Sequence, residues 1–319
     1  MLLGVVHSLK IVQTHNFSNH KLKPVMELIL QILFGGVKVS FKTSNPGIRI
    51  FLTSKYEEFL SQDLPEVAIT VKVGKPVGLI FENLVFKTDN WEYFRETDYS
   101  AIRMLTPGRP TRRSHYTIVL NAKGDKGDLY FEDIPWNSKE VLSITVPPFA
   151  LDEVLAVQLL GMKRGVMLHS CALITNNKQG LLFAGTSGDG KSTTAKLWQS
   201  SGKAVLLGDE RVAVRKRDGK FWLISTAWHG SGQVVGPGCV PLHHLFIIHH
   251  AKENHAKRLE PSEAVKLLLA RAYLPFWDRT GMEFSMEILE DLSNTIPCYS
   301  LGFTLDQRAV EYVECLLAS

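Results

Sequence analysis

Apolar and polar residues alternate in short runs from about Gly36 to Val146. Runs such as "VKVSF", "IRIFLT" and "YTIVLNA" place an apolar side chain at every second position, and Asn-Pro or Lys-Gly-Asp sequences that favour turns separate them. This pattern predicts antiparallel strands. A more continuous apolar segment before them predicts a helix from Pro24 to Phe34. Residues 1–149 are therefore predicted to form a β-rich N-terminal domain.

The pattern changes after the two prolines of "TVPPFALDE". A helix is predicted over "LDEVLAVQLLGMKRG", and from there to the end apolar strands alternate with helical segments. Between two of these strands, Asp218 and Gly219 form a strong signal for a tight β-hairpin turn. Residues 150–319 are therefore predicted to form an α/β domain.

The composition limits the kinds of partner and compartment. The 36 basic and 32 acidic side chains give a net charge of only +4, which does not favour nucleic acid or an anionic membrane as the main partner. The 4 cysteines are far apart, as expected for reduced thiols. The first residues lack the pattern of an export signal, and "VMELILQILFGGV" is too short to span a bilayer. We expect a cytoplasmic protein.

The stretch "LLFAGTSGDGKSTTAKLW" matches the pattern G-x-x-x-x-G-K-S of a Walker A loop, or P-loop, between an apolar strand and a helix. Glycines let backbone N–H groups point at phosphate oxygens, and the start of the helix adds positive potential. Lys191 can reach the outer phosphates, and the Ser192 hydroxyl can bind magnesium. The motif therefore predicts a site for ATP and Mg²⁺. Its predicted nucleotide-binding residues are Gly185, Thr186, Ser187, Gly188, Asp189, Gly190, Lys191, Ser192 and Thr193.

An acidic pair follows the next predicted strand, in "AVLLGDERV". Ligands of such sheets bind at the carboxyl ends of the strands, which places Asp209 and Glu210 at the edge that carries the glycine-rich loop. There, one carboxylate can hold the metal and the other can accept a proton. An acidic pair at an exposed strand end is the other interpretation, and the pair alone does not decide between them.

His169 lies in the strand before the loop. If "GVMLHSCALITNNKQGLLFAG" folds as a hairpin, His169 faces residue 184, or residue 186 if the turn shifts by one position. Both registers place it at the base of the glycine-rich loop. A packing role and a catalytic role, for which an imidazole that titrates near neutral pH is suited, both stay open.

Other candidates are less specific. Arg271 and Arg279 flank "LPFWD" and can either clamp a phosphate or lie in solvent. Trp228 and His229 can either contact a substrate or nucleotide, or be a packed loop aromatic and a solvent-facing histidine; we favour the second interpretation. Four further histidines lie at the two ends of one predicted strand, too far apart for a shared metal, and we interpret them as solubilising the strand ends. These are His243, His244, His249 and His250.

The segments "LHSCALI", "GTSGDGKST" and "LLGDERV", in this order and spacing, resemble the HPr kinase/phosphorylase family over roughly residues 151–313. The resemblance implies a nucleotide domain with a mixed sheet, similar to ATP-dependent phosphoenolpyruvate carboxykinase. It also implies phosphoryl transfer from ATP to a serine hydroxyl of a protein or peptide. By the same resemblance, His169 and Asp209 are catalytic, and Ser192 and Glu210 hold the metal.

Two features differ from the family pattern. Glu210 stands where the family commonly has Asp, and "TAWHGSGQVVGPG" replaces a signature rich in arginine and glycine. The acceptor therefore stays open, and so does a homo-oligomeric assembly. A catalytically inactive, nucleotide-binding regulatory module is the alternative function. The joint presence of four residues argues against it, namely Lys191, Ser192, Asp209 and His169. We expect residues 1–149 to select the acceptor.

Overall fold

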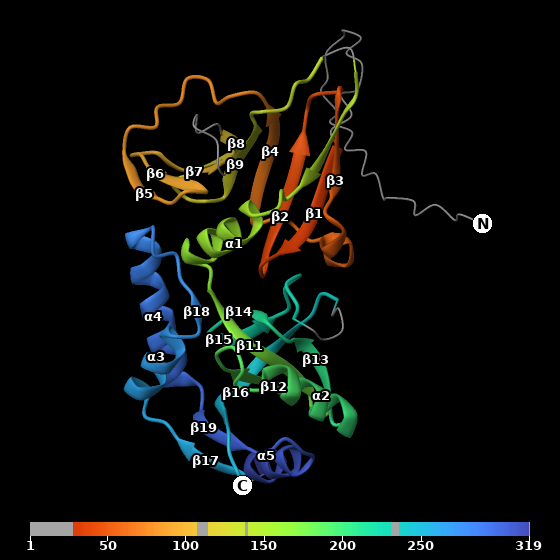
Figure 1. The fold of residues 1–319 in the computed structure, drawn as a ribbon, viewed down its shortest axis with the longest axis vertical. Coiled ribbons are helices and arrows are strands. Elements are labelled where there is room, and N and C mark those ends of the chain that lie inside the picture. The colour runs from red at the N-terminus through yellow and green to blue at the C-terminus, as the bar shows by residue number, and fades with distance from the viewer. Residues whose placement is uncertain (1–27, 107–113, 138–139, 231–235, 319) are drawn as a thin grey trace, which may run out of the picture. The chain divides into compact units, whose positions relative to one another are not determined.

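The computed structural model describes residues 28–106, 114–137, 140–230 and 236–318 (Figure 1). These residues form two compact units. The first contains residues 28–32 and 38–152, and the second contains residues 33–37 and 153–318. The division lies close to the predicted domain boundary, but the second unit also includes a short segment from the beginning of the chain.

The first unit is built on an eight-stranded sheet. In spatial order its strands are β1 (Leu28–Phe34), β2 (Val37–Thr43), β4 (Val67–Val73), β9 (Lys126–Phe131), β8 (Ser114–Asn121), β7 (Tyr99–Leu105), β6 (Trp91–Arg95) and β5 (Leu84–Lys87). A separate parallel pair joins β3 (Ile48–Leu52) to β10 (Leu142–Val146), and η1 (Ser54–Phe59) is a 3₁₀ helix.

Two predictions for this part of the chain need correction. The predicted helix is wrong over residues 28–34, which form strand β1; residues 24–27 lie outside the described residues. A short apolar run without clear periodicity fits a buried strand as well as a helix. The antiparallel prediction is confirmed from β9 to β5, but β2, β4 and β9 run parallel. Strand direction across such long-range pairs depends on chain connections that local alternation does not encode.

The second unit contains a nine-stranded mixed sheet and most of the helices. Strands β12 (Gly180–Ala184) and β19 (Cys298–Phe303) lie parallel to β16 (Cys239–His250), whereas β11 (Val166–Thr175) pairs antiparallel with four neighbours. The remaining strands are β13 (Ala204–Gly208), β14 (Arg211–Arg217), β15 (Lys220–Ile224), β17 (His255–Arg258) and β18 (Ala272–Tyr273). The helices are α1 (Leu151–Gly161), α2 (Lys191–Ser201), α3 (Pro261–Leu269), α4 (Arg279–Thr295) and α5 (Arg308–Ala318).

Successive residues of β12 point to opposite faces of this sheet, each covered by helices. Leu182 and Ala184 belong to a core cluster with side chains of α3 and α4. Phe183 belongs to a second cluster, where it stacks on Phe246 and contacts Trp198 of α2. Helix α5 contributes to the same cluster. The glycine-rich loop therefore starts from a strand that is buried on both faces.

The predicted hairpin at Asp218 and Gly219 is confirmed. Strands β14 and β15 pair up to Arg217 and Lys220, and both turn residues have positive φ values, 50° and 74°.

Residues 33–37 belong to the second unit and contain a second turn, formed by Gly35 and Gly36. Arg215, only 6% exposed, donates a hydrogen bond of 2.8 Å to the carbonyl of Gly36.

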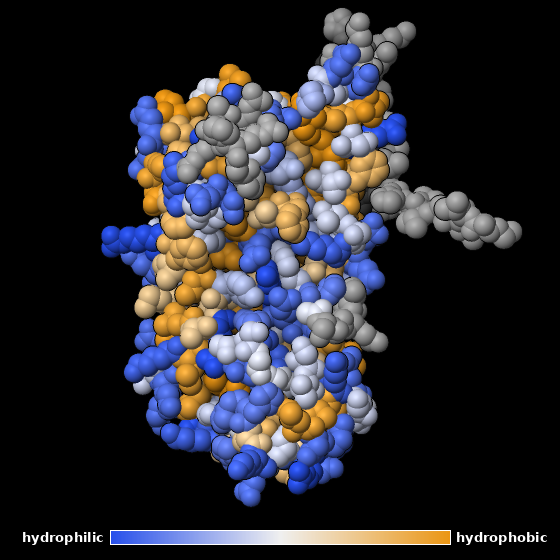
Figure 2. Space-filling model, in the orientation of Figure 1, coloured by the Kyte–Doolittle hydropathy of each residue, from blue (hydrophilic) through white to orange (hydrophobic). Residues whose placement is uncertain are grey.

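No helix in the described ranges is long and apolar enough to cross a membrane. The face drawn in Figure 2 shows hydrophilic and apolar residues side by side.

All 4 cysteines are free thiols, of which Cys171 and Cys298 are buried. Burial raises the pKa of the Cys298 thiol to about 12, so it stays protonated near neutral pH.

Candidate phosphate-binding site

The loop between β12 and α2 depends on its glycines. Gly188 and Gly190 have φ values of 90° and 98°, a region that side chains disfavour. At Gly190 a Cβ atom would also lie only 2.6 Å from Phe303 and 2.8 Å from His250. At Gly185 a Cβ would lie 2.9 Å from the Cβ of Asp189. A side chain at these positions would therefore strain this tight turn.

Side chains of the loop fold back onto it. Lys191 is 7% exposed, and its Nζ donates to the Thr186 carbonyl at 2.8 Å. Burial lowers the pKa of Lys191, although nearby Asp189 and Glu210 oppose this effect. The Oδ2 atom of Asp189 accepts bonds from the backbone N–H and the hydroxyl of Thr186. Ser192 and Thr193 are half-buried in the first turn of α2.

Strand β11 connects the glycine-rich loop to the acidic pair. The N–H of Gly185 donates to the carbonyl of His169 at 3.3 Å, and the N–H of Ser170 donates to the carbonyl of Glu210 at 3.0 Å. The register Ser170↔Ala184 places His169 opposite Gly185, midway between the two predicted registers. Two consecutive residues of one strand thus contact the loop and the acidic turn.

Cations surround the half-buried His169 imidazole, which also lies edge-on to the Tyr273 ring. Burial lowers its pKa, and nearby cations lower it further, whereas Asp189 acts in the opposite direction. These cations are Lys191, Arg211 and Arg271. The imidazole is therefore neutral near pH 7, and the positive potential around it suits an anionic ligand.

The two acidic residues have different surroundings. Asp209 is 2% exposed, and its Oδ1 accepts a bond of 2.9 Å from the N–H of Gly230, in the loop after β15. Glu210 is half-buried, and its Oε1 lies 3.8 Å from the Nε of Arg211. The negative charge of Glu210 also acts on the pKa of Lys191, where it opposes the effect of burial.

Arg271 and Arg279 lie in different environments. The Nη2 atom of Arg271 is 3.6 Å from the Oδ2 of Asp189, and its Nη1 donates to the carbonyl of Leu267. Its Nε is buried without a hydrogen-bond partner among the described residues. Arg279 is 92% exposed and pairs with Glu283 on its own helix. Of the two, only Arg271 is placed to contact a ligand of the loop.

His250 is a site residue that sequence reasoning missed. Its Nε2 lies 2.9 Å from the carbonyl oxygen of Gly188, so this histidine, although exposed at the strand end, also contacts the glycine-rich loop. β16 runs parallel to β12, so both strands end at the same sheet edge, but the sequence does not reveal that they are neighbours.

The packed interpretation of Trp228 is confirmed by its contacts with Phe34 and Arg211, and His229 is exposed.

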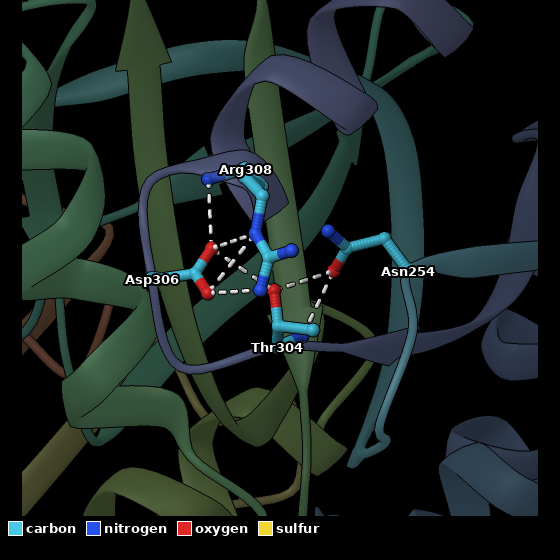
Figure 3. A network of polar contacts seen from close by, with 4 residues as sticks. All are labelled: Asn254, Thr304, Asp306 and Arg308. Atoms are coloured by element: carbon cyan, nitrogen blue, oxygen red, sulfur yellow. Dashed lines mark hydrogen bonds and ion pairs between the residues drawn. The ribbon is translucent and has the colours of Figure 1, made fainter.

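A polar network after β19 anchors the segment that supports Gly190 (Figure 3). Thr304 donates through its N–H to Asn254 at 2.8 Å, and its hydroxyl lies 3.1 Å from Asp306. Asp306 also accepts a bond of 2.7 Å from Arg308, which lowers its pKa to about 2. The network fixes the chain next to Phe303, whose ring lies beside Gly190.

The residues fit a magnesium ion that arrives with a nucleotide. No group of three or more His, Cys, Asp or Glu side chains is arranged around a metal position in the described ranges. Mg²⁺ in phosphate sites commonly takes only one or two protein oxygens, with phosphate and water as further ligands. Ser192, in the first turn of α2, and Glu210, whose charge acts on Lys191, are oxygen donors of the required type.

Comparison with solved structures gives a weak likeness. No family model matches the chain, and no curated protein matches it. Among solved structures, the HPr(Ser) kinase/phosphatase from Coxiella burnetii aligns with 48% of this chain and 99% of its own, at 11% identity and a TM-score of 0.29. By its own sheets and helices, the chain is a strand-rich mixed α/β protein.

Proposed function

We propose that the chain is an ATP- and Mg²⁺-dependent kinase that phosphorylates a serine hydroxyl of a protein or peptide. The observation that carries the proposal is that β11 is hydrogen-bonded both to the glycine-rich loop and to the acidic pair of Asp209 and Glu210. Through its backbone, His169 binds Gly185 and the adjacent Ser170 binds Glu210. A kinase needs held phosphates, charge neutralisation and an oriented hydroxyl, and it needs them within one small site.

In this proposal the glycine-rich loop and Lys191 hold the phosphates, as in a phosphoenolpyruvate-carboxykinase-like nucleotide domain. Lys191 leaves the Thr186 carbonyl for a phosphate oxygen, which is a stronger, charge-assisted partner. Arg271 contributes a second charge beside Asp189. Mg²⁺, held by Ser192 and Glu210, neutralises charge on the phosphates when it is bound with ATP.

Asp209 is proposed as the proton acceptor. The bond between its Oδ1 and the N–H of Gly230 fixes the carboxylate, which would accept the proton of the acceptor hydroxyl. As the serine oxygen bonds to the γ-phosphorus, the bond from phosphorus to the departing ADP oxygen breaks and the hydroxyl proton moves to Asp209. His169, neutral near pH 7, orients the reacting groups.

The test is transfer of label from [γ-³²P]ATP with Mg²⁺ to a panel of serine-containing peptides, using the full-length chain. We expect phosphopeptide from wild-type protein and none from Lys191→Ala, because the lysine holds the transferred phosphate. Lys196→Ala, exposed on the same helix, is the matched control and should transfer normally. Nucleotide binding without any phosphopeptide would instead favour the inactive regulatory module.

A further inference from the structure

The first unit contains a cavity at one end of its eight-stranded sheet. Its volume is about 630 Å³, within the range of roughly 300–1,000 Å³ that is usual for small-molecule sites. The lining side chains come from the ends or beginnings of β7, β8 and β6 and from residues that follow β4 and β9. Three carboxylates and two cations line it, namely Glu92, Glu132, Asp133, Lys75 and Arg103.

Arg103 is already paired and held in place. Its guanidinium lies over the rings of Phe81 and Phe94, with 4.7 and 4.8 Å from its Cζ to the two ring centroids. Its Nη1 is also 3.7 Å from the Oε2 of Glu92, and the other oxygen of Glu92 is 3.3 Å from Lys87. The carboxylate of Glu92 and the cations Arg103 and Lys87 therefore pair within the protein.

Glu132 is held differently, by neutral groups. Its Oε1 accepts one hydrogen bond of 2.9 Å from the Ser114 hydroxyl and a second, short bond from the hydroxyl of the fully buried Thr117. Across the described ranges, no Lys, Arg or His side chain forms an ion pair with it. The two hydroxyls fix one oxygen of Glu132 at the cavity wall, where neither described lining cation, Lys75 or Arg103, forms an ion pair with its carboxylate.

We propose that this cavity binds a cationic group, an ammonium or a guanidinium, with Glu132 as its counter-charge. A fixed carboxylate loses little entropy on binding, so it favours a ligand that supplies the missing positive charge. The source that we favour is a basic side chain of the acceptor peptide. This choice of source rests on the proposed kinase function, whereas the cation site itself does not.

Calorimetry on the full-length chain tests the cation site directly. We expect N-acetyl-arginine amide to bind and its neutral isostere, N-acetyl-citrulline amide, to bind at least about tenfold more weakly. Glu132→Gln keeps an oxygen for the two hydroxyls, so it should retain its melting temperature and bind the arginine probe about tenfold more weakly. Glu58→Gln, which removes an exposed carboxylate of the same unit, should bind like wild type. Equal affinity for both probes, or no effect of Glu132→Gln, would overturn the inference.

A kinetic experiment separates the inference from the kinase function. Serine peptides that carry either arginine or citrulline are compared as phosphate acceptors for wild type and Glu132→Gln. We expect the arginine peptide to have the lower KM, and this advantage to disappear in the variant while kcat stays unchanged. Arginine binding without transfer to any peptide would contradict only the kinase function. Transfer without an arginine preference would contradict the peptide source of the cation.

Discussion

The Nε2 atom of His250, at the end of β16, lies 2.9 Å from the carbonyl oxygen of Gly188 in the glycine-rich loop. A carbonyl can only accept, so the imidazole nitrogen donates. The same ring lies beside Gly190 and packs on Phe303. The end of a neighbouring parallel strand thus holds the two glycines of the loop that have positive φ values.

His250→Ala should weaken nucleotide binding by about tenfold, because the loop loses a hydrogen bond of about 1 kcal/mol together with its packing support. His250→Gln, which can still donate to the carbonyl, should recover part of the affinity. Titration with a fluorescent ATP analogue measures this. His249→Ala, also exposed at the end of β16, is the control and should bind normally. Equal affinities in all variants would show that the contact is irrelevant to binding.

Asp209→Asn should reduce turnover by about a hundredfold or more with little change in ATP affinity. Asn keeps an oxygen for the Gly230 N–H but cannot accept the hydroxyl proton. Single-turnover transfer and equilibrium binding give the two quantities. Asp218→Asn, the same substitution in the exposed β14–β15 turn, should leave both unchanged. Wild-type turnover in Asp209→Asn would remove the proton-acceptor role.

His169→Gln should change how stability depends on pH. The native pKa of His169 lies below its ordinary value of 6.5, because of burial and nearby cations, so the unfolded chain binds the proton more tightly. Wild type therefore loses stability relative to the variant as pH falls below about 6.5, until the native imidazole also protonates. Melting temperatures of both proteins from about pH 8 to about pH 5 test this. A constant difference across this range would contradict the lowered pKa.

Gly190→Ala should destabilise the fold by about 1–3 kcal/mol, through its positive φ and the 2.6 Å approach of a Cβ to Phe303. Gly202→Ala is the matched control, since Gly202 also has a positive φ, 67°, but no atom within 4 Å of a Cβ. Its cost should be about 1 kcal/mol. Urea unfolding gives both values. An equal cost would mean that Phe303 and His250 move aside without penalty.

Local signals predicted the parts of the site that are continuous in the sequence. The glycine-rich loop, its strand and helix, and the turn at Asp218 each depend on neighbouring residues, and the structure has them there. The contact of His250 with Gly188 depends on β16 lying beside β12, and the parallel pairs of the first sheet depend on similar long-range neighbours. The helix prediction over residues 28–34 failed because an apolar run without periodicity leaves the choice to its sheet partners.

The turn at Gly35 and Gly36 has a consequence for how this protein can be divided or recombined. Arg215 of the second unit donates to the carbonyl of Gly36, and a Cβ at Gly35 would lie 2.7 Å from the Cβ of Ala156. A fragment that starts near Val146 would lack this acceptor, and loss of the buried hydrogen bond would cost about 1–3 kcal/mol. The second unit is therefore discontinuous in the sequence: a graft of it into another protein needs two separate stretches of the gene, and one protease cut cannot release it intact.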